Sequence, residues 1–136
     1  MANAIYSKYK EACMKGGANI DLDTGTVRCA LVDTATYTFS DTHEFLSSLS
    51  GVVGTAQAIA NTTVGVVAAA VFDGDNVTYT AVTGASAEAL VIYIDTGVAG
   101  TSRLVAYIDT GVTGLPVTPN SGDIAITWDA SGIFKL

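Results

Sequence analysis

The sequence predicts a mainly β, single-domain fold: an antiparallel β-sandwich or barrel with an N-terminal helix and one short second helix. The first observation behind this prediction is a repeated phrase, in which Tyr93 to Gly100 (YIDTGVAG) returns as Tyr107 to Gly114 (YIDTGVTG). Each copy is a strand-like run that ends in a turn, so we expect neighbouring strands. The second observation is that short alternating runs and turn signals follow one another without the long intervening helices of a parallel α/β sheet.

Length and composition narrow the class further. The 136 residues fit one domain, with the β-rich body at 26–136. Only 14% of the residues are charged, below the roughly 25% of typical soluble domains, which suggests that other chains cover part of the surface. The net charge is −7 with 6 basic residues, so we expect no binding to nucleic acid or to anionic membranes, which need clustered Lys and Arg.

Targeting signals are not evident. No apolar run reaches the ~18 residues of a membrane span, and the first residues lack the apolar core of a signal peptide. We therefore expect the chain to be made and kept in a cytoplasm, where Cys13 and Cys29 remain reduced thiols.

The first element is an expected helix over residues 3–15. Asn3 is a good N-cap, and Gly16-Gly17 provides a stop. Glu11 and Lys15 have the favourable i,i+4 order on the exposed face. The apolar face consists of Ile5, Tyr9, Ala12 and Cys13.

The next segment contains one strand and the second helix. Residues 26–33 alternate, which predicts a strand with one buried face, and Tyr37 and Phe39 belong to a short extended piece. Asp41 to Glu44 resembles a capping box followed by Phe45, Leu46 and Leu49, so a helix of about two turns is predicted at 42–49.

The remaining chain is read as strands and turns. Residues 52–60 and 63–72 favour two strands, although the alanine run at 68–70 leaves a helix open for the second. Turns are expected at 21–25, 73–76, 84–86 and 129–132; strands at 77–81, 87–95, 104–109, 124–128 and 133–136; and an edge or connection at 115–120, which holds both prolines.

Three Asp-Thr-Gly triplets, at Asp23, Asp95 and Asp109, raise the possibility of an aspartic protease. That chemistry needs two loops from separate lobes or subunits, whereas the copies at 95 and 109 belong to one expected hairpin. We favour turns, in which Asp accepts local backbone hydrogen bonds and Gly takes a positive φ.

Other catalytic or metal patterns are incomplete. Asp21-x-Asp23-x-Gly25 and Asp73-Gly74-Asp75-Asn76 could hold calcium, but neither has Glu at the twelfth loop position. His43 is the only histidine, and no Cys-x-x-Cys pair or Gly-x-Ser-x-Gly elbow occurs. We therefore assign no catalytic, cofactor-binding or metal residue and expect a protein that is not an enzyme.

The aromatic residues are interpreted first as core or interface anchors, with a carbohydrate platform as the alternative. They are Tyr6, Tyr9, Tyr37, Phe39, Phe45, Phe72, Tyr79, Tyr93, Tyr107, Trp128 and Phe134.

Three phrases together resemble a family of small structural proteins of tailed bacteriophages. They are the opening MANAIYSKYKEA at 1–12, the central AEALVIYIDTG at 87–97, and GLPVTPNSGDIAITWD at 114–129. The resemblance covers most of the chain, weakens over 50–72, and brings no catalytic motif.

This resemblance implies a virion component assembled in the host cytoplasm, and within that a capsid decoration (cement) protein that clamps the major capsid protein. The implied partners are the major capsid protein or other virion proteins, and a homo-oligomer, most simply a trimer. A neck, adaptor or tail component is the first alternative. A glycan-binding β-sandwich module is an alternative of another class.

Overall fold

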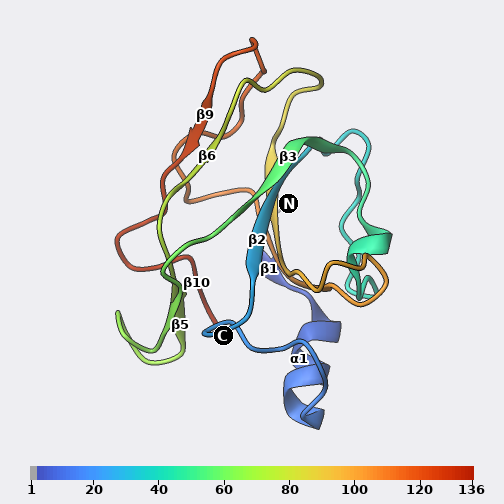
Figure 1. Cartoon of the computed structure of the whole chain (residues 1–136), viewed down its shortest axis with the longest axis vertical. Helices are drawn as coiled ribbons and strands as arrows, with labels where there is room; N and C mark the ends of the chain where they lie inside the picture. Colours follow the sequence, from blue (N-terminus) through green and yellow to red (C-terminus); the bar gives the residue numbers. More distant parts are fainter. Residues whose placement is uncertain (1–2) are drawn as a thin grey trace.

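The structure, a computed structural model, describes residues 3–136. It is mainly β, with antiparallel sheets and a single α-helix in the described range (Figure 1), which confirms the predicted class. The elements are β1 Ala4–Ile5, α1 Ser7–Lys15, β2 Val27–Val32, the 3-10 turn η1 Leu46–Ser48, β3 Val52–Ala58, β4 Thr63–Val64, β5 Val71–Asp73, β6 Val77–Tyr79, β7 Ala89–Ile94, β8 Arg103–Ile108, β9 Ile124–Ile126 and β10 Phe134–Lys135.

The largest sheet has the order β1-β8-β7-β2-β3, and every neighbouring pair is antiparallel. Its centre is the hairpin that the repeated phrase predicts, with Leu90 opposite Ile108 and Ile94 opposite Arg103. All six residues of β7 and all six of β8 are buried. A strand buried on both faces needs cover from two sides.

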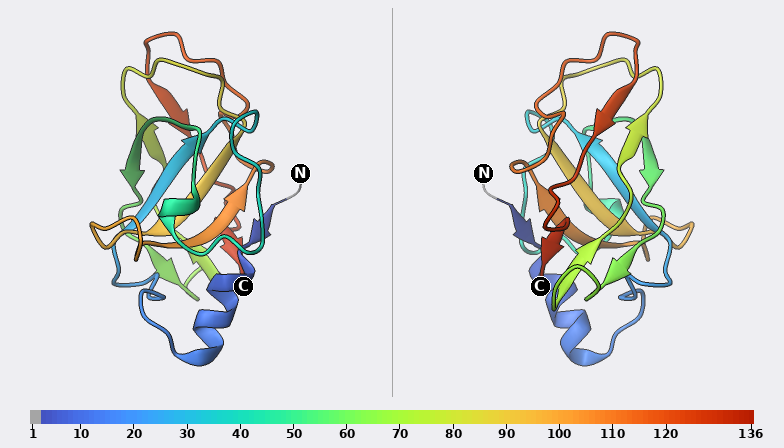
Figure 2. Two further views of the ribbon diagram at one scale, coloured as in Figure 1. Left: turned by 90° about the vertical axis from the view of Figure 1, so that its right-hand side faces the viewer. Right: turned by 90° about the vertical axis from the view of Figure 1, so that its left-hand side faces the viewer.

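Two layers supply that cover (Figures 1 and 2). The sheets β10-β5-β4 and β6-β9 lie against one face, and the irregular segment 33–51 lies against the other. The arrangement is sandwich-like, and the three sheets do not close into the alternative barrel. The helix α1 sits at one end of the large sheet, where Tyr9 and Ala12 are buried.

The predicted helix at 3–15 begins too early. Ala4 and Ile5 form β1, which pairs with Tyr107 and Ala106 of β8, so α1 starts only at Ser7. Asn3 is not an N-cap: its Oδ1 accepts hydrogen bonds from the backbone N–H groups that follow β8, at 2.8 and 3.0 Å.

The end of this helix is as predicted. Gly16 is left-handed, with φ 65°, and its N–H caps the helix. Lys15 Nζ lies 3.9 Å from Glu11 Oε2.

The predicted two-turn helix at 42–49 is reduced to one short 3-10 turn. Phe45 is extended and bridges Arg103, and only η1 is helical there. The apparent capping residue Glu44 is engaged elsewhere, because its carboxylate lies 3.0 Å from Arg103 Nη1 and its carbonyl accepts from Leu104 N–H. The segment therefore runs along the start of β8.

Two strand predictions also need correction. The expected strand at 63–72 is divided into β4 and β5 because Gly65 and Ala70 have positive φ values of 75° and 61°. In β2, Ala30 and Val32 are buried as fully as their neighbours, because cover on both sides leaves no exposed face.

Gly132 is expected to be among the glycines most sensitive to substitution. Its φ is 109°, and a Cβ there would collide with Cγ1 of Val71, whereas Gly97 has φ 84° with open space around it. Gly132→Ala should lower the free energy of unfolding by about 3 kcal/mol or more, and the matched Gly97→Ala by about 1 kcal/mol. Urea denaturation measures both, and equal losses would contradict the steric argument.

Candidate functional site

The Asp-Thr-Gly triplets lie in separate turns. Because β7 and β8 are antiparallel, Asp95 follows one end of the hairpin and Asp109 the opposite end. A six-residue strand spans about 20 Å, so these carboxylates cannot share a proton as in an aspartic protease.

Asp95 shows what the triplet does instead. Its carboxylate accepts hydrogen bonds from Gly97 N–H at 2.9 Å and from Arg28 Nε at 2.7 Å. The Gly97 N–H is the main cause that holds the Asp95 pKa below its usual range, and Arg28 assists. The aspartate fixes a turn and an ion pair.

The carboxylates of the two acidic turns also accept hydrogen bonds from other groups of the chain. The Asp21 carboxylate accepts from the Thr24 hydroxyl and from the Thr24 and Asp23 N–H groups, which together lower its pKa. Asp75 Oδ2 accepts from Asn61 at 2.7 Å. Within residues 3–136, no three His, Cys, Asp or Glu side chains gather as metal ligands.

His43 takes part in a chain of hydrogen bonds that the sequence does not predict. The Tyr6 and Tyr37 hydroxyls are 2.8 Å apart, and the Tyr37 hydroxyl is 2.7 Å from His43 Nδ1. Tyr6 is fully buried and Tyr37 nearly so, and burial raises the pKa of both. This line anchors segment 37–43 to the large sheet.

Both cysteines carry free thiols. Cys29 is fully buried, and burial raises its pKa to about 12. Cys29 therefore packs in the core as a hydrophobic residue.

The aromatic residues face inward. Eight of the eleven are buried, and Phe39, Phe45 and Phe134 are half-buried. A groove of about 500 Å³ beside Tyr37 and Phe39 contains Glu88, but Glu88 Oε1 already accepts from the N–H and hydroxyl of Thr34, both at 3.0 Å. None of these rings offers the exposed face that stacks on a sugar.

The surface contains a long stretch without charge, which we call the neutral ribbon. From Phe45 to Phe72 the chain has no Asp, Glu, Lys, Arg or His. The neutral ribbon forms η1, β3 and β4, and β3 and β4 are the outer strands of two different sheets. Natural proteins usually protect such edges with charged residues, so this surface is suited to contact with another chain.

The most exposed part of the neutral ribbon is its hairpin tip, residues 64–70 (VGVVAAA). Every residue of the hairpin tip is exposed, and Val66 reaches 74%. The turn is closed by hydrogen bonds from Gly65 N–H to the Val71 carbonyl and from Val71 N–H to the Ala68 carbonyl. The fold therefore holds a group of apolar side chains in water, as at protein contact sites.

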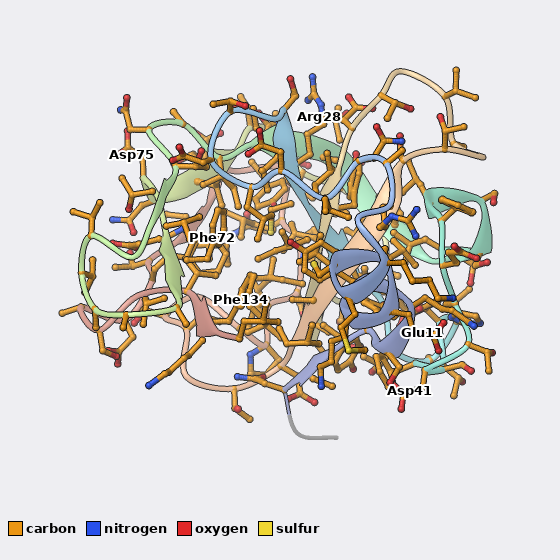
Figure 3. All side chains as sticks on the ribbon, turned by 90° about the horizontal axis from the view of Figure 1, so that it is seen from below. Glu11, Arg28, Asp41, Phe72, Asp75 and Phe134 are labelled. Carbon is orange, nitrogen blue, oxygen red and sulfur yellow. The ribbon has the colours of Figure 1, made fainter. Side chains whose placement is uncertain are left out.

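An apolar cleft of about 580 Å³ borders the hairpin tip. The rings of Phe72 and Phe134, with centroids 5.2 Å apart, form one wall (Figure 3). Tyr9 of α1 and the loop residues 20–23 form the other. Exposed Asp21 and Asp23 lie beside it. The cleft was not predicted from the sequence, because α1, β5 and β10 come from distant parts of the chain.

Comparisons with known proteins give no further identification: neither the family models nor the curated proteins contain a match to this chain. Among the described residues, no helix is both long and apolar enough to cross a bilayer.

Proposed function

We propose that this chain is a non-enzymatic structural protein of a tailed-phage virion, most simply a capsid decoration protein that binds and stabilises the shell of major capsid protein. The observation that carries the proposal is the neutral ribbon, whose outer strands lack the charges that keep sheet edges apart. The three phrases that resemble phage structural proteins supply the setting.

Stabilisation by such a protein requires burial of surface, not chemistry. An exposed β3 edge, with Val52 44% exposed, could pair with or pack against a capsid subunit and exclude water there. Many identical copies on a shell would multiply a modest contact into a large effect on shell stability.

Copy number in purified particles tests the position in the virion. A decoration protein should be present at a number comparable to the major capsid protein, and its removal should lower the temperature at which the shell opens. A ring of about twelve copies, as at a single symmetric vertex, would instead indicate a neck or adaptor component. Retention on immobilised polysaccharide would favour the glycan-binding alternative.

A charge placed on the β3 edge tests the surface itself. Thr55→Lys, at an exposed position in β3, should reduce occupancy on particles stripped of this protein by about tenfold, because a lysine on an edge opposes strand pairing. The matched Thr78→Lys, at an exposed position in β6 outside the neutral ribbon, should change occupancy less than about twofold. Equal effects would contradict docking through β3.

A further inference from the structure

We infer that the hairpin tip of one copy packs into the apolar cleft of a second copy, so that the chain forms a two-fold symmetric pair. The occupant of the cleft is thus residues 64–70 of an identical chain. This inference concerns contacts between copies, and it rests on the proposed function only for its role on a shell.

The two halves of the contact are present on one chain. The hairpin tip offers valine and alanine side chains, and the cleft offers an apolar recess lined by Ile20, Leu22, Phe72, Phe134 and Leu136. Within this surface, Val64, Ala70 and Leu136 belong to the exposed residues. Packing a neighbouring tip there would remove apolar surface from water on both sides.

The low charge of this surface favours a contact between two identical acidic chains. Each copy carries a net charge of −7, so two copies repel each other wherever acidic faces meet. The hairpin tip and the walls formed by β5 and β10 present valine, alanine, phenylalanine and leucine to the cleft, and its carboxylates, Asp21 and Asp23, are exposed to solvent. Two copies can therefore approach here through a largely apolar surface whose carboxylates remain at its margin.

The position of the tip determines the symmetry. Val64 and Ala70, at the two ends of the tip, are themselves part of the cleft wall. A two-fold axis between the tip and the cleft places each tip in the other copy's cleft at once, as an isologous contact requires. A ring of three would need the tip and the cleft on faces turned well away from each other, so the pair is favoured over the trimer expected from the resemblance.

The contact area sets the strength. The tip and cleft together contain about fifteen residues a side, fewer than the 20–30 of a standard interface. We therefore expect a weak pair, with Kd of about 10–100 µM at ~0.15 M salt. A contact of this strength becomes significant when copies are held close together on a shell.

Sedimentation of the full chain between about 5 and 500 µM tests the pair. We expect a monomer–dimer equilibrium that tightens as salt rises, because salt screens repulsion between the acidic copies. A chain that stays monomeric throughout, or that forms trimers, would overturn the inference. Neither result would affect the copy-number test of the proposed function.

Variants at the tip locate the contact. Val66→Asp should weaken pairing by about tenfold or more, since it places a charge in an apolar cleft beside Asp21 and Asp23. Val66→Lys should weaken pairing less than Val66→Asp, because those carboxylates attract it. The matched Val98→Asp, at a position 59% exposed in the β7–β8 loop, should leave pairing unchanged, and equal effects of the two aspartates would overturn the assignment.

Crosslinking gives a readout that is independent of affinity. When a Val66→Cys chain is mixed with a Leu136→Cys chain under mild oxidation, we expect a disulfide-linked pair of the two chains. A Val98→Cys chain mixed with Leu136→Cys should not form that product, and both mixtures contain the same native cysteines. Equal crosslinking in the two mixtures would contradict the placement of the tip in the cleft.

Discussion

Raising the pH above about 10 is expected to unfold the protein in one cooperative step. All six tyrosines are at most 5% exposed, and burial is the largest cause that raises the pKa of each. In the unfolded chain the same phenols ionise near pH 10. Above that pH the unfolded state binds fewer protons than the folded state, so the free energy of unfolding falls as pH rises.

The size of this effect follows from the most deeply buried phenols. Tyr6, Tyr9 and Tyr79 have the largest upward pKa shifts. Each lowers the free energy of unfolding by up to about 1.4 kcal/mol per pH unit, so the three together lower it by about 4 kcal/mol per pH unit. Because a small domain has about 5–15 kcal/mol of stability, we expect unfolding within about two or three units above pH 10.

Phenolate absorbance and far-ultraviolet circular dichroism, followed together against pH, measure this transition. The two signals should change at the same pH, because ionisation requires unfolding. The stabilising contribution is fully present below about pH 10 and is lost above it. Phenolate signals that rise near pH 10 while the circular dichroism stays native would show that the tyrosines are accessible in the folded state.

Replacement of Arg103 is expected to cause the largest loss among charged residues. Arg103 is 7% exposed, and it donates to Glu44 at 3.0 Å and to the Ala18 carbonyl at 3.1 Å. Its guanidinium carbon lies 5.0 Å from the centroid of the Phe45 ring. The side chain thus ties β8 to the loop after α1 and to segment 44–48.

Arg103→Ala should lower the free energy of unfolding by about 3 kcal/mol, because it leaves the Ala18 carbonyl and the Phe45 ring without their partner and removes a buried aliphatic stem. Arg103→Lys should cost about half as much, since lysine keeps the stem and charge but not the planar fork. Urea denaturation of both variants provides the measurement.

Glu44→Gln is the control that separates packing from charge. The Glu44 side chain is 41% exposed, and solvent screens such a pair, so the loss should stay below about 1 kcal/mol. A loss as large as that of Arg103→Ala would show that the ion pair, rather than the packed stem and the carbonyl contact, holds the segment.

Features that depend on residues close together in the chain could be predicted from the sequence. The repeated YIDTG phrase correctly predicted the β7–β8 hairpin, because alternation and a glycine turn are properties of adjacent residues. The helix stop at Gly16 was predicted for the same reason. The inward-facing aromatic residues followed from their positions in alternating runs.

The wrong predictions arose where a distant partner competes with a local one. Asn3 and Glu44 have the chemistry of helix-capping residues, but Asn3 Oδ1 accepts hydrogen bonds from the backbone that follows β8, and the Glu44 carboxylate accepts one from Arg103. Ala70 breaks the expected strand with a positive φ that alanine rarely adopts. Such competition depends on residues far along the chain.

One part of the candidate site can be recognised in the sequence, and the other part cannot. The lack of charge from Phe45 to Phe72 is visible in the sequence, and it is the signal that could have located the neutral ribbon. The cleft beside the hairpin tip has no such signal, because Leu22, Phe72 and Phe134 meet only when α1, β5 and β10 are in place.

The strand pairing has a consequence for how the protein is made. β1 pairs with β8, and β5 pairs with β10, so each sheet can be completed only after a strand from much later in the chain has left the ribosome. High contact order of this kind slows folding to about milliseconds or seconds. During that time the edges of β3 and β4 are open to nascent neighbours. Yield on overproduction should therefore depend on folding speed, and slower synthesis at lower temperature should favour correctly folded chains over inclusion bodies.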